Sequence, residues 1–391
     1  MAPKPRVGRS PEEGLLEAAA CAFVHDQPLD PRELEARPLD WELVLERAEA
    51  ERLAPLLFAL SDGLPVPAPV RDRLRVAWVS ARRSYLLGAR QLSELLAAFV
   101  GGRVPVMPLK GPALAATLYR DPGLRPFTDL DLLVRSADLP RALRVLSGLG
   151  YGPLEAGDSL SHELRWRHAA TFVKGKPRPG EFPVDLHWAL LDYPGVTAAG
   201  TVDAQGSWDR AVKVQGWDHP AWGLCPEDLL VYLALHWGVH HAFSGLLWQL
   251  DLALLLRSMG ATLDWAGVVS RVRRWRVSAG LYFALSATQG LGMGAPPSVL
   301  DRLRPGTFRC ALVGWMRRRD GKALARLDYL LPLLLMDGAG DPLRAVAGGA
   351  FPPPGWVRSR YAKGSLLGAY LAHYGRVGKV CLRTARGALA R

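Results

Sequence analysis

The stretch Arg125-Pro-Phe-Thr-Asp-Leu-Asp-Leu-Leu-Val134 carries the pattern that decides the fold of this chain. Its second half alternates acid and leucine and ends in an apolar run, which predicts a β-strand. Because successive side chains of a strand point to opposite faces, Asp129 and Asp131 are expected to project together from one face. Leu130 and Leu132 are then turned into the core. The sequence therefore predicts a strand with a paired-carboxylate face.

Paired carboxylates repel each other, and burying them is costly unless a cation neutralises their charge. Hard oxygen ligands suit Mg²⁺ or Mn²⁺ better than zinc. Two such ions about 4 Å apart can clamp the attacking and the leaving oxygen in phosphoryl chemistry. Such a site requires a third carboxylate, and Asp185, in the predicted strand Val184-Asp-Leu-His-Trp188, is best placed. We predict a metal site at Asp129, Asp131 and Asp185; the alternative is a set of solvated acids on an edge strand.

The rest of the chain predicts helices on both sides of a central group of strands. Residues 11–98 repeat apolar side chains at helical spacing, and the chain from about Pro226 onward is again mostly helical. Residues 170–174 and 182–188 flank a loop rich in Lys, Pro and Gly, which suggests a hairpin. The expected fold class is α+β, with a small mixed sheet inside a helical frame. The predicted parts are a helical N-terminal region (1–98), a core (99–215) and a helical C-terminal domain (216–391).

Length, charge and cysteine spacing exclude several classes of protein. At 391 residues the chain is long enough for two or three domains. Its net charge of +12 favours anionic partners such as nucleotides, nucleic acid or acidic lipid, unless the excess is spread evenly over the surface. Four cysteines lie far apart without CxxC spacing, so a reducing cytoplasm is the predicted setting. The sequence offers neither a secretory signal nor an uncharged apolar window of about 18 residues, so no membrane span is expected.

Three blocks of the sequence resemble one known family. They are Leu109-Lys-Gly-Pro-Ala-Leu together with the segment 125–134, then Val184-Asp-Leu-His-Trp188, and finally the helical stretch Leu229–Leu255. The combination is similar to the bacterial uncharacterised nucleotidyltransferases of the polymerase-β superfamily. The resemblance implies a polymerase-β-like nucleotidyltransferase core and extends over most of residues 40–375.

The resemblance also implies roles for individual residues. Lys110 and Gly111 are expected to hold phosphate, with Thr128 beside them as a further nucleotide-binding residue, while Asp129, Asp131 and Asp185 complete the metal site. One departure is that Pro112, rather than Ser, follows the glycine, which removes a hydroxyl and a backbone N–H donor. Arg125 is a second candidate to neutralise phosphate oxygens, or alternatively forms a salt bridge that orients the Asp strand.

Several polar residues are candidates for a supporting or acceptor-binding role. His187 follows Asp185 at i+2 and is expected on the same strand face, as an acid/base aid or as a packing residue. His236 and His240 share one helix face at zinc-ligand spacing, but no glutamate stands in an HExxH position. A structural role across the helical domain, or toward Asp251, is therefore the main expectation for them, and lining the acceptor pocket is the alternative.

The predicted activity is Mg²⁺-dependent transfer of a nucleotidyl group from a nucleoside triphosphate, with ATP the expected donor. The acceptor is expected to be a small molecule or peptide rather than a nucleic acid, by analogy with tailoring enzymes. Without GxxxxGK[ST], GxGxxG or GxSxG motifs, kinase, dehydrogenase and hydrolase interpretations lose their usual support. The alternative is a degenerate core that senses nucleotide or binds a protein or RNA partner. The sequence leaves the oligomeric state open.

Overall fold

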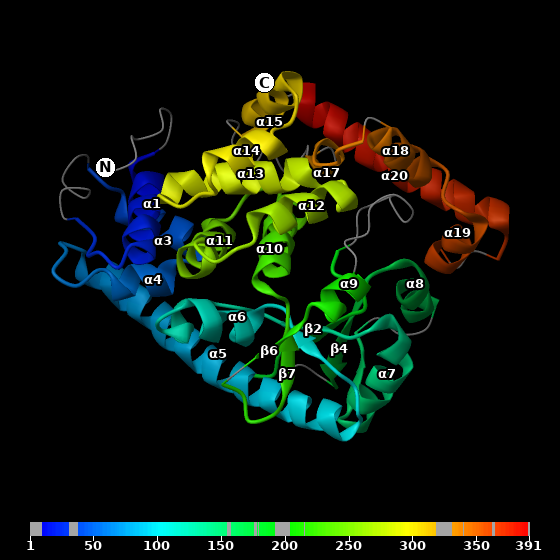
Figure 1. Cartoon of the computed structure of the whole chain (residues 1–391), viewed down its shortest axis with the longest axis horizontal. Coiled ribbons are helices and arrows are strands. Elements are labelled where there is room, and N and C mark those ends of the chain that lie inside the picture. Colours follow the sequence, from blue (N-terminus) through cyan, green and yellow to red (C-terminus); the bar gives the residue numbers. More distant parts are fainter. Residues whose placement is uncertain are drawn as a thin grey trace.

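The computed structural model describes residues 10–30, 38–154, 158–175, 178, 180–191, 204–214, 216–317, 331–338, 340–361 and 364–389. Within them the chain is an α+β protein in which a small mixed sheet lies against layers of helices (Figure 1). The expected fold class is confirmed.

The N-terminal part is helical, as its apolar spacing predicts. Its helices are α1 (Pro11–Val24), α3 (Trp41–Ala50), α4 (Ala54–Ala59) and α5 (Ala68–Gly101). Ser10 caps α1 in a capping box with Glu13, and Asp40 caps α3 through the backbone N–H groups of Glu42 and Leu43. These local signals fix where the first helices begin.

A five-stranded sheet follows, in the order β1-β2-β5-β4-β3. Its strands are β1 (Met107–Pro108), β2 (Leu130–Leu133), β3 (Tyr151–Pro153), β4 (Ala169–Lys174) and β5 (Val184–His187). The helices between them are α6 (Gly111–Leu118), the 3₁₀ turns η1 (Pro122–Leu124) and η2 (Ser136–Asp138), α7 (Leu139–Gly148) and α8 (Asp158–Trp166). The predicted hairpin is present, because β4 and β5 pair antiparallel. The acidic strand β2 lies between β1, which is antiparallel to it, and β5, which is parallel.

The second half is almost entirely helical and lies over the sheet (Figure 1). Its elements are α9 (Ala204–Asp209), the small sheet β6 (Val212–Val214) and β7 (Ala221–Gly223), α10 (Pro226–His241), α11 (Leu246–Met259), α12 (Trp265–Trp275), α13 (Ser278–Thr288), η3 (Gln289–Leu291), α14 (Pro297–Leu303), α15 (Thr307–Arg317), α17 (Leu331–Leu334), α18 (Asp341–Ala350), α19 (Pro354–Tyr361) and α20 (Leu366–Leu389).

Two helices join the parts of the molecule. The long helix α5 contributes Val70 and Leu74 to the core of the N-terminal helices and its C-terminal half to the core under the sheet. Helix α11 places Leu250 against the N-terminal helices and Leu255 in the core of the C-terminal helices. Burying apolar surface on both sides fixes each helix in place, and α11 thereby reaches the loop that precedes the acidic strand.

Candidate active site

Three carboxylates lie side by side on one face of the sheet and are called the ledge below: Asp129, Asp131 and Asp185. Asp131 pairs in register with Asp185 across the parallel strands, and Asp129 stands two residues earlier, just before β2 begins. Leu130 and Leu132 are fully buried on the other face, as the alternation predicts. All three acids line one pocket of about 340 Å³, which places them together although Asp131 and Asp185 are 54 positions apart in the sequence.

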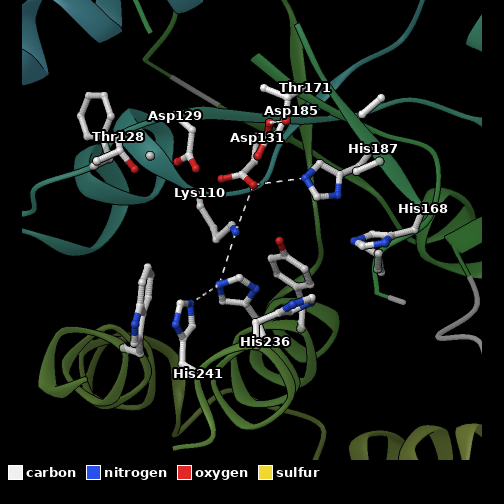
Figure 2. A pocket seen from close by; sticks show the side chains of 18 of the residues that line it. Lys110, Thr128, Asp129, Asp131, His168, Thr171, Asp185, His187, His236 and His241 are labelled. Atoms are coloured by element: carbon white, nitrogen blue, oxygen red, sulfur yellow. Dashed lines mark hydrogen bonds and ion pairs between the residues drawn. The ribbon is translucent and has the colours of Figure 1, made fainter. Parts of the chain in front are cut away.

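The pocket lies between the sheet and the C-terminal helices. Figure 2 shows the three carboxylates on one side and the histidines of α10 on the other, with Lys110 between them. The loop before β2 supplies Thr128, which is exposed toward the pocket, and α11 supplies Trp248. The volume lies within the range of small-molecule sites in proteins.

Asp131 is the carboxylate of the ledge that contacts basic side chains. Its Oδ1 accepts from Lys110 Nζ at 3.0 Å and from His187 Nε2 at 3.1 Å, and the side chain is 4% exposed. Burial alone raises the pKa of Asp131, but the charge of Lys110 and the hydrogen bond from His187 outweigh it and hold the pKa well below the usual range. Asp131 is therefore ionised at neutral pH.

Asp129 has the opposite environment. Among the described residues no hydrogen bond or ion pair reaches its carboxylate. Burial, followed by the neighbouring charge of Asp131, raises the pKa of Asp129 to about 6. The third acid, Asp185, accepts a hydrogen bond from Thr171 Oγ1 at 2.6 Å across the β4–β5 pairing. Asp129 is thus the carboxylate of the ledge without a hydrogen-bond or ion-pair partner among the described residues, and the charges of Lys110 and Arg52, which lower its pKa, do not outweigh burial and Asp131.

The Lys-Gly turn packs directly against the start of the acidic strand. Gly111 has a φ of +60°, in the left-handed region, and a Cβ added there would lie 3.1 Å from the backbone oxygen of Asp129. The turn opens α6, with Pro112 in its first turn. Only glycine fits this position without strain, and the fit brings Lys110 over the carboxylates.

Arg125 lines the pocket but is paired inside the wall. Its Nε donates to Oδ1 of Asp251 at 2.8 Å and its Nη2 to Oδ2 at 2.7 Å, and both side chains are at most 2% exposed. Tyr119 donates its hydroxyl to the same carboxylate at 2.7 Å. This geometry matches the salt bridge considered as the alternative for Arg125, and it links the loop before β2 to α11.

Histidines of α10 form the opposite wall. His236 Nε2 lies 3.4 Å from Lys110 Nζ and 3.2 Å from His241 Nε2, so a chain of contacts runs from Asp131 through Lys110 to the helix (Figure 2). Because an ammonium group only donates, His236 Nε2 is the acceptor. Burial, with the charge of Lys110 adding to it, lowers the pKa of His236 well below its ordinary value, and burial is also the main reason that the pKa of His240 and His241 is about 4.

The comparison with known families agrees with this arrangement. The family model described as uncharacterised nucleotidyltransferase matches residues 37–291, well over half of the chain. The chain belongs to this family. Every carboxylate and histidine of the pocket lies within the matched segment, whereas α1 and the helices after residue 291 lie outside it. A search of curated proteins finds no match.

A divalent cation is the group that this nucleotidyltransferase fold implies, and the donors fit it chemically. Three carboxylates supply hard oxygen ligands, and Asp129 in particular forms no ion pair in the described part of the chain. As they stand, the described residues contain no group of three His, Cys, Asp or Glu side chains arranged to hold a metal ion. Lys110 occupies the contact to Asp131 that an ion would otherwise make.

Sequence reasoning missed several residues that line the pocket. Thr171 faces Asp185 on the neighbouring strand, Tyr232 and Trp248 come from the helices, and Arg52 comes from the turn after α3. The register of the predicted hairpin could have identified Thr171, since it lies opposite Asp185. The sequence gives no indication that Arg52 belongs to the pocket, because no feature of the residues around it shows that this turn, nearly 80 residues before Asp129 and Asp131, folds back to them.

No described helix combines the length and the apolar character that crossing a bilayer requires.

Proposed function

We propose that the protein is a metal-dependent nucleotidyltransferase that transfers a nucleotidyl group from a nucleoside triphosphate to a hydroxyl or phosphate group of a small-molecule or peptide acceptor. The observation that supports this most directly is the ledge of Asp129, Asp131 and Asp185 facing one pocket. Membership of a nucleotidyltransferase family supports the same reaction type. ATP is the proposed donor.

In the proposed reaction, an acceptor oxygen forms a bond to the α-phosphorus while the bond between that phosphorus and the oxygen bridging to the β-phosphate breaks. Pyrophosphate leaves with the electron pair, and a proton from an acceptor hydroxyl passes to a base or to solvent. Asp129, Asp131 and Asp185 would hold a divalent cation, which would supply neutralisation of the phosphate charge. Asp185 is the proposed aid in activating the hydroxyl.

Lys110 is the proposed phosphate-binding cation of the turn. Its Nζ contacts Asp131 now, and the same ammonium group can turn to an anionic oxygen because three of its protons serve as donors. Burial lowers the pKa of Lys110, but the charge of Asp131 outweighs burial and raises it, so the group stays charged. Gly111 keeps the backbone close enough to the ledge for this contact.

The wall formed by His236 and His240 is the proposed acceptor side. It faces the ledge across the pocket, and the lowered pKa of both histidines keeps them neutral and able to donate or accept hydrogen bonds. His187 contacts Asp131 and is proposed to position it. A pocket volume of about 340 Å³ favours a small acceptor or the end of a peptide over a nucleic acid duplex.

The first test is calorimetric titration of each of the four ribonucleoside triphosphates into the purified full-length protein, with and without Mg²⁺. Magnesium-dependent binding of one triphosphate is expected for the natural sequence and is lost in Asp129→Asn/Asp131→Asn. Circular dichroism of the double variant checks that it is folded. No binding of any triphosphate by folded protein contradicts the proposal.

A second candidate function is nucleotide sensing by a degenerate core. Two observations favour it: Pro112 removes a donor from the turn, and Lys110 is ion-paired with Asp131. Release of pyrophosphate from the bound triphosphate in Mg²⁺, with water as a slow acceptor, separates the two functions. Turnover that is lost in Asp129→Asn supports transfer, whereas binding without turnover supports sensing.

A further inference from the structure

Arg52 occupies an unusual backbone position at the pocket. It follows the end of α3, and its φ of 58° lies in the left-handed region that favours glycine. The N–H of Arg52 donates to Glu49 O at 3.1 Å, and the N–H of Leu53 donates to Ala48 O at 2.7 Å. This pair of hydrogen bonds is a common way for a helix to end, and the residue in the left-handed position is then usually glycine. An arginine at that position costs backbone strain.

The turn is fixed to α11, the helix that supplies Trp248 to the pocket. The carboxylate of Glu51, the residue before Arg52, accepts the backbone N–H of Leu246 at the start of α11. The guanidinium Cζ of Arg52 lies 5.8 Å from the centre of the Trp248 ring on the same helix. The N-terminal helices therefore deliver a positive charge to a defined place at the rim of the site.

The charge of Arg52 is available, in contrast to two other basic residues of the pocket. Lys110 is paired with Asp131, and Arg125 forms a bidentate salt bridge with Asp251. Arg52 makes no ion pair with any described residue and is half-buried. Burial and Lys110 do most to lower the pKa of His241, and Arg52 adds to them, so its charge acts on the pocket.

We propose that Arg52 binds the β- and γ-phosphates of the nucleoside triphosphate. The proposal rests on the proposed function and names the residue that distinguishes a triphosphate from a monophosphate. A guanidinium group presents several N–H donors in a plane, which matches phosphate oxygens better than an ammonium group does. It also supplies donors in a pocket whose Lys-Gly turn has lost one to Pro112.

The test compares Arg52→Gln and Arg52→Gly in the full-length protein by calorimetry, with magnesium triphosphate and with the corresponding monophosphate. Loss of a charge-assisted hydrogen bond predicts roughly 10–100-fold weaker triphosphate binding. Monophosphate binding is expected to change less than about twofold, because the guanidinium does not contact the α-phosphate.

Arg103 provides a matched control for the backbone. It ends α5 with a φ of 53° and the same pair of bonds, Arg103 N–H to Val100 O and Val104 N–H to Phe99 O, but it does not line the pocket. Glycine at either position relieves strain, so Arg52→Gly and Arg103→Gly are both expected to raise Tm by about 1–3 °C. Only Arg52→Gly is expected to weaken triphosphate binding.

The outcomes separate this inference from the proposed function. Unchanged triphosphate affinity in both Arg52 variants overturns the role of Arg52 and leaves nucleotidyl transfer standing. Equal weakening of monophosphate and triphosphate binding also overturns it, since the residue then shapes the pocket for the nucleoside. If the natural sequence binds no triphosphate, the proposed function fails and this inference fails with it.

Discussion

Asp129 and Asp131 stand two residues apart on one face of the chain, yet their environments act on them in opposite directions. Asp131 is neutralised by Lys110 and His187, whereas Asp129 lacks a partner among the described residues and has a pKa of about 6. This difference is what the proposed metal site predicts, because a cation bound to Asp129 would supply a charge that no described residue places in an ion pair with it.

Asp129→Asn is expected to stabilise the protein in metal-free buffer at pH 8. The folded pKa of Asp129 lies above its ordinary value, so the contribution of this group to stability is present at low pH and is lost as pH rises through about 6. Removing the charge should therefore raise the free energy of unfolding by about 1–2 kcal/mol at pH 8 and by roughly half as much at pH 5. Urea unfolding in EDTA measures this.

The fully exposed Asp62 supplies the control for that experiment, since Asp62→Asn should change stability equally little at both pH values. The same Asp129→Asn protein should lose the stabilisation that added Mg²⁺ gives to the natural sequence. Equal stability of Asp129→Asn and the natural sequence at pH 8 would show that the ledge carries no uncompensated charge.

At the scale of elements, the site depends on how α11 and the Lys-Gly turn meet the acidic strand. The Arg125–Asp251 pair joins the loop before β2 to α11 in a fully buried position. Gly111 joins α6 to the same strand by backbone contact with Asp129. Neither junction is a catalytic group, but each sets the distance between the carboxylates and the facing wall.

Asp251→Asn is expected to destabilise the protein by about 3–5 kcal/mol, because it leaves the buried guanidinium of Arg125 without its counter-charge. The double variant Arg125→Leu/Asp251→Leu should recover much of that loss, since no charge is then buried alone. Chemical denaturation of the natural sequence, Arg125→Leu, Asp251→Leu and the double variant gives the coupling energy. Additive effects of the single variants would contradict the pairing.

Gly111→Ala is expected to cost about 2–3 kcal/mol and to weaken magnesium triphosphate binding. The new Cβ meets the backbone oxygen of Asp129 at 3.1 Å, in addition to the strain of a positive φ. Gly63 is the matched control: its φ is +79°, but a Cβ there meets nothing within 4 Å. Gly63→Ala should therefore show the strain alone, about 1 kcal/mol, with binding unchanged.

At the scale of the whole molecule, the pocket exists only where three parts of the chain meet. The N-terminal helices deliver Arg52, the sheet delivers the carboxylates, and the C-terminal helices deliver the histidines and Trp248. The division at residues 98 and 215 remains a prediction, and both α5 and α11 contribute to two hydrophobic cores each. The parts are therefore expected to unfold together.

The free energy of unfolding is expected to fall as pH is lowered from 7 to 5. His236 is held neutral in the folded state by burial and by Lys110, with His240, His241 and Asp131 also facing it, whereas the unfolded chain takes up the proton. A proton bound only on unfolding contributes about 1.4 kcal/mol per pH unit, and the raised pKa of Asp129 offsets part of this. His236→Gln should flatten the pH dependence measured by urea unfolding; an unchanged slope would contradict it.

The sequence by itself determined what local rules govern. Alternation of acid and leucine placed Asp129 and Asp131 on one strand face, and the spacing of apolar residues gave the helical flanks and the hairpin that carries Asp185. These features depend on residues only two to four positions apart, so their signal is readable in the chain. The Lys-Gly turn was identified through family resemblance, and the family assignment is confirmed.

Only the tertiary structure decided how distant residues are paired. It directs Arg125 to Asp251 rather than to the open pocket, brings His236 to Lys110, and carries Arg52 to Trp248 on α11. Such contacts depend on the packing of α10 and α11 over the sheet, which is fixed by apolar burial between segments more than 100 residues apart in the sequence. A polar residue shows no sign in the sequence of which partner that packing will place beside it.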